Sequence, residues 1–240
     1  MLEEIATQVF WIGLAKIIGV NVVLSGDNAV VIALAARSLP AKQRSQAILW
    51  GAGAAVVLRI ILTIFAVALL ALPWLKIVGS LLLFWIGIKL LVPEDDDADI
   101  NASEHLMTAI KTILIADLVM SLDNVIAVAA AAGGSLTLLI LGLAISIPLV
   151  VFGATLLVKL MERYPVIITG GAALIGMVAG EMLVTDPVAL EWMKGIAGIQ
   201  IADGKPKLHD VSLELAAGAL GAVIVVVWGL WLARRRAGNS

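Results

Sequence analysis

Seven stretches of this 240-residue chain are apolar over a length near the roughly 20 residues that a helix needs to cross a bilayer. They cover residues 8–36, 46–72, 74–92, 106–132, 135–159, 165–185 and 212–233. Hydrophobic residues make up 62% of the chain and charged residues 14%, against about 25% charged residues in a typical soluble domain. We therefore expect an all-α polytopic membrane protein with seven transmembrane helices, surrounded by the lipid bilayer.

The composition excludes several classes of function. The chain has no cysteine and only two histidines, His105 and His209, which argues against disulfides, thiolate metal sites and histidine-rich metal sites. A formal net charge of −2 gives no basic surface for nucleic acid. Since no nucleophile–base pair and no cofactor motif is found, we expect neither an enzyme nor a bound cofactor.

The distribution of lysine and arginine predicts the orientation in the membrane. The acidic start, Met1-Leu-Glu-Glu, differs from a basic secretory signal, so we expect the first stretch to remain as a span. With the N-terminus outside and the C-terminus in the cytoplasm, most basic residues lie on the cytoplasmic side: Arg37, Lys42, Arg44, Lys89, Lys111, Lys159, Arg163 and Arg234–Arg236. The outer side then holds Lys76, Lys194, Lys205 and Lys207.

The chain contains an internal repeat. Residues 23–36 read VLSGDNAVVIALAA, and residues 119–132 read VMSLDNVIAVAAAA, with seven identical positions at an offset of 96. Two Ser-x-Asp-Asn motifs inside apolar stretches are unexpected from composition alone, because carboxylates are costly in a membrane. Each copy has three predicted spans, so the second copy is expected to be inverted relative to the first, as in many secondary transporters.

This repeat predicts the organisation of the chain. We expect five parts: a first three-helix repeat (1–92), an acidic linker (93–104), a second, inverted three-helix repeat (105–185), an extracytoplasmic loop (186–211) and a seventh helix with a basic C-terminus (212–240). Residues 188–199 of the loop are a candidate helix lying flat on the membrane.

The polar residues of the two copies fall on one face of each helix. Asn21, Ser25 and Asn28 are spaced i, i+4, i+7, and Asp117, Ser121 and Asn124 repeat this spacing. Asp27 and Asp123 lie about a quarter-turn aside, where they can face each other across a pseudo-two-fold axis. Gly26 can loosen the first helix, whereas Leu122 at the equivalent place gives no reason to expect a break in the second.

These eight residues supply carboxylate, amide and hydroxyl oxygens. Such ligands suit Mg²⁺, Ca²⁺ or Mn²⁺. Alternatively, the serines and asparagines join helices by hydrogen bonds. Arg59 is either a counter-charge to a carboxylate in the ion-free state, or a structural or snorkelling side chain. Glu181 is either a ligand at one mouth of the pathway or a solvated residue at a helix end.

The two motifs, SGDNAVVIALAA and DLVMSLDNVIAVAAAA, resemble those of the TerC family, in particular its short bacterial members, and the similarity covers essentially the whole chain. The resemblance implies a metal-ion transporter of the bacterial cytoplasmic membrane, linked to manganese export and historically to tellurite resistance. It carries a metal-site role to the residues Asp27, Asn28, Asp123, Asn124, Asn21 and Asp117.

Two functions therefore compete. The first is export of a divalent cation, with Mn²⁺ as the preferred substrate. In this case Ser25, Ser121, Arg59 and Glu181 are candidate residues of the transport pathway. The second is a non-transporting membrane scaffold of a metal- or tellurite-stress complex. The sequence leaves open the choice between Mn²⁺, Ca²⁺ and Mg²⁺, coupling to protons, and whether the chain forms an oligomer.

Overall fold

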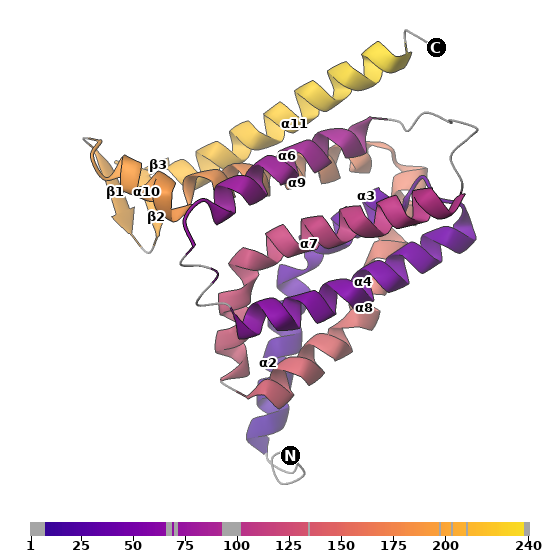
Figure 1. The fold of residues 1–240 in the computed structure, drawn as a ribbon, viewed down its shortest axis with the longest axis horizontal. Coiled ribbons are helices and arrows are strands. Elements are labelled where there is room, and N and C mark those ends of the chain that lie inside the picture. The colour runs from indigo at the N-terminus through magenta and orange to yellow at the C-terminus, as the bar shows by residue number, and fades with distance from the viewer. Residues whose placement is uncertain are drawn as a thin grey trace. The chain divides into compact units, whose positions relative to one another are not determined.

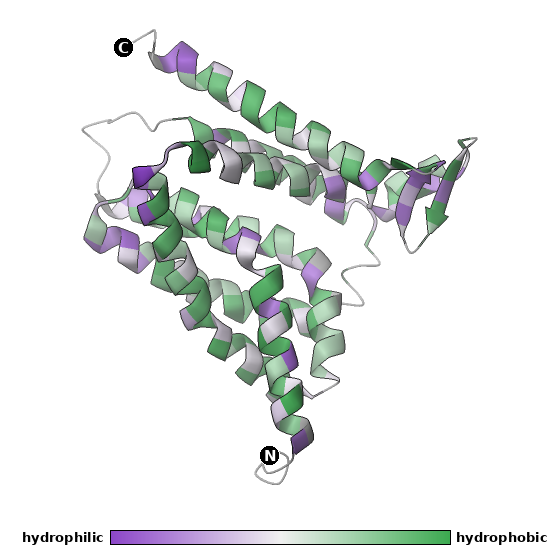
Figure 2. Cartoon of the chain, turned by 180° about the vertical axis from the view of Figure 1, so that it is seen from behind, coloured by the Kyte–Doolittle hydropathy of each residue, from purple (hydrophilic) through white to green (hydrophobic). Residues whose placement is uncertain are grey.

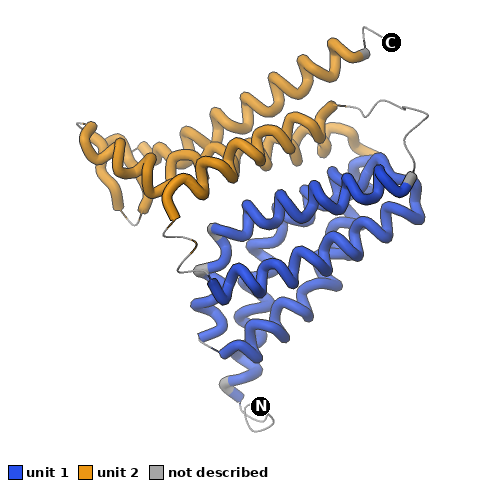
Figure 3. The backbone as a smooth tube through the Cα atoms, viewed as in Figure 1, with its two compact units in different colours: residues 1–67, 99–162 blue, residues 68–98, 163–240 orange. Residues whose placement is uncertain are grey.

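The computed structural model describes residues 8–65, 69, 72–92, 102–133, 135–196, 198–202, 204–209 and 211–237. Most of these residues form helices (Figure 1). The chain divides into two compact units (Figure 3): unit 1 comprises residues 1–67 and 99–162, and unit 2 comprises residues 68–98 and 163–240. Each unit thus combines segments from both halves of the sequence.

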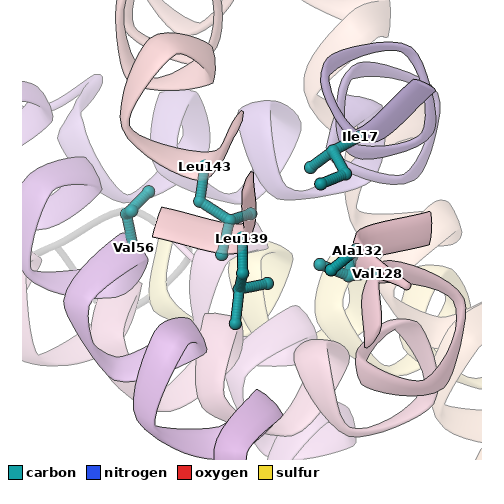
Figure 4. Close-up of a cluster of buried hydrophobic side chains, with 6 residues drawn as sticks. All are labelled: Ile17, Val56, Val128, Ala132, Leu139 and Leu143. Carbon is teal, nitrogen blue, oxygen red and sulfur yellow. The ribbon is translucent and has the colours of Figure 1, made fainter. Parts of the chain in front are cut away.

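Unit 1 contains the helices that carry the repeated motifs. They are α2 (Gln8–Leu24), α3 (Gly26–Ala36), α4 (Ala41–Ile64), α7 (Ala102–Ala132) and α8 (Leu136–Arg163). Helix α7 contacts α2, α3 and α4. Apolar side chains from α2, α4, α7 and α8 form a buried cluster (Figure 4), made up of Ile17, Val56, Val128, Ala132, Leu139 and Leu143. This packing holds the motif-bearing helices together.

The first apolar stretch is a broken helix. Helices α2 and α3 meet at Ser25 with a bend of 51°. The loosening expected at Gly26 is therefore confirmed. Helix α7 runs without interruption through Leu122, the equivalent position of the second copy, so the two copies differ as expected.

Unit 2 is built around α9 (Val166–Val184), on which α6 (Leu75–Leu91) and α11 (Leu213–Ala237) pack. Glycines allow α9 and α11 to approach each other closely. A Cβ atom placed on Gly180 would overlap the backbone of Ala217, and one on Gly176 would meet the carbonyl oxygen of Gly221. The Gly176-x-x-x-Gly180 pair thus serves close helix packing, as its spacing predicts.

The polar stretch before α11 contains a short helix and a small sheet. Helix α10 (Pro187–Met193) is followed by β1 (Ile199–Ala202), β2 (Lys205–Leu208) and β3 (Val211–Ser212), which form an antiparallel sheet in the order β1-β2-β3. Ile199 pairs with Leu208, and Lys207 with Ser212. The prediction of a flat helix over residues 188–199 is wrong beyond Met193, where α10 ends. Residues 199–202 alternate between half-buried and exposed and pair as a strand, so this stretch is not purely helical.

Within the described ranges, five helices are long and apolar enough to cross a membrane, and the bent pair α2–α3 brings the number to six. Hydrophobic residues dominate along these helices (Figure 2). Helix α6, which fills the predicted span at 74–92, has only 17 residues, at the short limit for a span. Several apolar helices thus support a multi-pass membrane protein, while seven spans and an inverted repeat remain predictions.

The acidic linker lies mostly outside the described residues. Its part at 93–101 is not described, whereas residues 102–104 already belong to the first turn of α7. The linker therefore ends earlier than the predicted boundary at residue 104.

Candidate cation site

Unit 1 gathers polar residues from both copies of the repeat around one basic side chain. Arg59, near the C-terminal end of α4, is buried, and its Nη2 atom lies 2.5 Å from Oδ1 of Asp117 on α7. Its Nη1 donates to Asn21 Oδ1 at 2.8 Å and to Ser25 Oγ at 2.9 Å. Its Nε donates to Ser121 Oγ at 3.0 Å. One guanidinium therefore binds oxygens of both copies.

The two copies present matching pairs of ligands to Arg59. In the first copy, Ser25 Oγ donates to Asn21 Oδ1 at 3.3 Å, one helical turn away. In the second copy, Ser121 Oγ donates to Asp117 Oδ2 at 3.1 Å, over the same i, i+4 spacing. The alignment of Asn21 with Asp117 at an offset of 96 thus corresponds to a shared contact in the structure. Asn21, Ser25 and Asn28 line one cavity, although the break at Ser25 places Asn28 on α3 and Asn21 on α2.

A residue of α8 completes the cluster. Asn21 Nδ2 donates to Ser146 Oγ at 2.5 Å, and Ser146 in turn donates to the carbonyl of Leu143. The sequence analysis did not assign Ser146 to the site. The signal available was a hydroxyl two residues before Pro148, a helix-breaking residue inside an otherwise apolar span.

The break in the first copy creates a partner for the second. Asn124 Nδ2 donates at 3.1 Å to the carbonyl of Leu24, the last residue of α2. A carbonyl at the end of a helix has no partner within that helix and must find one elsewhere. Asn124 therefore ties α7 to the broken end of α2.

Asn28 occupies the equivalent position of the first copy but has no such partner. Its side chain is only 3% exposed, and neither its Oδ1 nor its Nδ2 atom makes a hydrogen bond among the described residues. The two copies also differ in their backbone, because α2 ends at Leu24 whereas α7 is unbroken at the equivalent position. A buried amide without a partner costs free energy, so its persistence suggests a ligand or water.

Asn28 lines a small cavity together with the ligands of Arg59. The cavity has a volume of about 10 Å³ and is bordered by Asn21, Ser25, Asn28, Arg59 and Asp117, with apolar side chains on its remaining walls. A volume of about 10–15 Å³ is what one water molecule needs. Among its described lining residues, the charged ones are Arg59 and Asp117.

A second cavity adjoins the break between α2 and α3. It has a volume of about 280 Å³ and is lined by α2, α3 and α8, including Val22, Gly26 and Gly153. Ser25 supplies the polar side chain among the described residues of its wall, and it also lines the smaller cavity. Ser25 therefore lies between the larger, apolar cavity and the small cavity at Arg59.

Of the two motif aspartates, the structure describes the side chain of Asp27 but not that of Asp123. Asp27 is half-buried in the first turn of α3, where its Oδ1 accepts a hydrogen bond from the backbone N–H of Asn28 at 2.8 Å. A carboxylate is favoured there by the helix dipole. Asp123 lies on α7, but its side chain falls outside the described residues. The expected approach of Asp27 and Asp123 therefore stays a prediction.

Glu181 belongs to the other unit. It is half-buried on α9 and packs against Gly218 of α11. A Cβ atom placed on Gly218 would lie only 3.0 Å from the Cγ atom of Glu181. Among the described residues, no cluster of three or more acidic, histidine or cysteine side chains could hold a metal ion. Any cation in the described part of the cluster must therefore rely on amide and hydroxyl oxygens besides a carboxylate, which hard cations accept.

A buried carboxylate of unit 2 was also missed in the sequence analysis. Asp186, with 0% exposure, accepts hydrogen bonds from the backbone N–H groups of Trp74, Lys76, Ile77 and Val188 at 2.8–3.3 Å. It caps the start of α10 and satisfies free N–H groups at the start of α6. The signal available was an Asp directly before Pro187, a typical helix start. Its role is structural.

Comparisons with known proteins agree with the motifs. The uncharacterised membrane protein YjbE of Bacillus subtilis (strain 168) is 46% identical over 177 residues, covering 74% of this chain and 81% of that protein. The uncharacterised membrane protein YceF of the same organism is 26% identical over 190 residues, covering 75% of this chain and 74% of its own length. No solved structure matches the chain. A sequence profile of the integral membrane protein TerC family matches residues 6–237. This chain therefore belongs to the TerC family of integral membrane proteins.

Proposed function

We propose that this protein exports a divalent cation, Mn²⁺, across the bacterial cytoplasmic membrane, with the cation binding among the motif residues of unit 1. The observation that carries the proposal is the small cavity at which the buried amide of Asn28, without a hydrogen-bond partner among the described residues, lies beside Asn21, Ser25 and Asp117. These oxygens are hard ligands, and the expected ligands Asp27, Asp123 and Asn124 lie on the same two motifs.

Mn²⁺, Ca²⁺ and Mg²⁺ share oxygen ligands, and Mg²⁺ usually keeps several water molecules when it is bound. With Arg59 in place, the cavity has a volume of about 10 Å³ and room for about one water-sized particle. The choice of Mn²⁺ therefore rests on the family resemblance, and uptake measurements test it.

Export is the proposed direction. If the C-terminus is in the cytoplasm, we expect the acidic stretch 94–99 on the cytoplasmic side, where it would raise the local concentration of cations. This segment is outside the described residues. Its contribution is therefore expected to depend on ionic strength rather than on a defined contact.

The direct test is uptake of Mn²⁺, Ca²⁺ and Mg²⁺ into sealed inside-out vesicles, with and without a pH gradient. We expect uptake of Mn²⁺ by the native chain and loss of uptake in Asp27→Asn, Asp123→Asn and Asp117→Asn. Glu162→Gln is the matched control, because Glu162 is an exposed carboxylate of unit 1 that pairs with Arg44. Native uptake in both Asp27→Asn and Asp123→Asn would reject the site, whereas absence of uptake of all three ions by the native chain would favour a scaffold.

Cellular metal content separates these two functions independently. A strain lacking the protein should accumulate Mn²⁺ and become sensitive to it. If the content of another divalent ion changes instead, the choice of Mn²⁺ is wrong but the oxygen-ligand site stands. If no divalent ion changes, the scaffold is the better proposal.

A further inference from the structure

The buried cluster already holds a cation, namely the guanidinium of Arg59. Four of its five N–H groups donate to oxygens of Asn21, Ser25, Asp117 and Ser121. These are the oxygens that a metal ion at this place would need. A metal ion bound to these oxygens would lie close to the guanidinium, and the two cations would repel each other strongly in a buried site.

Charge balance leads to the same conclusion. Asp117 pairs directly with Arg59 and balances its charge. The pair and its hydrogen bonds stabilise both buried charges in a membrane interior. A divalent cation added beside Arg59 would be repelled by the guanidinium, and this repulsion is strong where the dielectric constant is low.

We propose that Arg59 is a tethered counter-cation that occupies the ligands of the transported ion in the empty protein, and that ion binding requires its guanidinium to leave. This proposal rests on the proposed function and deepens it. Return of Arg59 to Asp117 then drives release of the ion and allows the empty site to change its accessibility.

Asn28 distinguishes this arrangement from a permanent structural ion pair. A cluster built only to join α2, α4 and α7 would be expected to pair every buried polar group. Here the amide of Asn28 borders the same cavity as Arg59 and has no partner among the described residues. It is thus positioned to bind a ligand that arrives when Arg59 leaves.

The test is Mn²⁺ binding to the purified full-length chain in detergent, measured by isothermal titration calorimetry, with transport measured in proteoliposomes. Arg59→Gln removes the competing charge, so we expect it to bind Mn²⁺ about tenfold more tightly than the native chain and to transport it more slowly. Arg59→Lys keeps the charge and should stay close to native affinity. Arg44→Gln is the control, because the half-buried Arg44 pairs with the exposed Glu162 and donates to the carbonyls of Leu39 and Arg37 outside the cluster, and it should change neither quantity.

A measurement on the native chain covers the case in which Arg59→Gln does not fold. Phenylglyoxal modifies accessible guanidinium groups, and peptide mapping reports the modified residue. We expect Mn²⁺ to increase modification of Arg59 while that of Arg44 is unchanged. Unchanged or reduced modification of Arg59 at saturating Mn²⁺ would overturn the inference.

The outcomes separate the inference from the proposed function. If the native chain transports Mn²⁺ but folded Arg59→Gln binds it no more tightly, only the role of Arg59 is wrong. The inference would also be overturned if Arg59→Lys and Arg59→Gln bound Mn²⁺ equally tightly and both more tightly than the native chain, because loss of the charge would then not explain the higher affinity. If neither the native chain nor Arg59→Gln binds Mn²⁺, Ca²⁺ or Mg²⁺, the proposed function itself fails and the inference falls with it.

Discussion

Arg59 and Asp117 form a buried ion pair, with 2.5 Å between Nη2 and Oδ1, although they lie on different helices and 58 residues apart in the chain. Such a pair is stable only when the remaining donors and acceptors are also satisfied, because both charges lose their water. Asn21, Ser25 and Ser121 meet this requirement for Arg59. The pair therefore depends on both sequence repeats at once.

Removing the carboxylate should destabilise the protein strongly. In Asp117→Asn the guanidinium of Arg59 stays buried without a counter-charge, and we expect the free energy of unfolding to fall by about 3 kcal/mol. Unfolding in a fixed detergent, followed by circular dichroism, measures this change. The exposed pair Arg44–Glu162 provides the control, and Glu162→Gln should cost less than about 1 kcal/mol.

The double variant Arg59→Gln/Asp117→Asn removes both charges together. We expect it to recover more than half of the stability lost in Asp117→Asn, because no uncompensated charge remains. Transport should stay absent, since the carboxylate ligand is missing. Equal destabilisation by Asp117→Asn and Glu162→Gln would contradict the burial argument.

The two motif asparagines should respond differently to the same substitution. Asn124→Ala removes a hydrogen bond to the Leu24 carbonyl, so the free energy of unfolding should fall by about 1 kcal/mol. Asn28→Ala removes no hydrogen bond between described residues and should change stability by less than about 0.5 kcal/mol, yet weaken Mn²⁺ binding. Denaturant titration and calorimetry measure the two effects. If Asn28→Ala destabilised the protein as much as Asn124→Ala, the amide of Asn28 would have a structural partner after all.

Close packing of α9 on α11 should be sensitive to a single methyl group. In Gly180→Ala the new Cβ would overlap the backbone of Ala217, and we expect a loss of about 2 kcal/mol. Gly170 lies on the same helix and has no neighbour within 4 Å of a Cβ atom, so Gly170→Ala should be neutral or stabilising by up to about 1 kcal/mol. Thermal unfolding of both variants tests the contrast, and similar melting temperatures would argue against the close contact.

Asp186 should be essential for the folding of unit 2 but not for the chemistry of transport. Asp186→Ala leaves four backbone N–H groups without their acceptor, and we expect a loss of about 3 kcal/mol. Asp186→Asn keeps one acceptor oxygen and should lose about half as much. Glu191→Gln, on an exposed residue of the neighbouring helix, is the control. Folded Asp186→Asn should still transport Mn²⁺, and loss of transport without loss of stability would assign Asp186 a further role.

The sequence alone determined the local features of this protein. Long apolar stretches must form helices in a membrane because their backbone groups have no other partners there. The i, i+4 spacing places Asn21 beside Ser25 and Asp117 beside Ser121, whatever the packing of the helices. The break expected at Gly26 is also local, and the unbroken second copy follows from Leu122 in the same way.

Only the tertiary structure decided which groups meet. Periodicity locates Arg59 within an apolar span but cannot select Asp117 as its partner, because that choice depends on how α4 packs against α7. The different surroundings of Asn28 and Asn124, which share one motif, likewise arise from the contact between α7 and the broken end of α2. Asp186 and the small sheet show the same principle, since N–H groups of residues far apart in the sequence find acceptors only after the chain has folded. Local spacing is a property of one helix, whereas the satisfaction of buried charges and polar groups is a property of their packing.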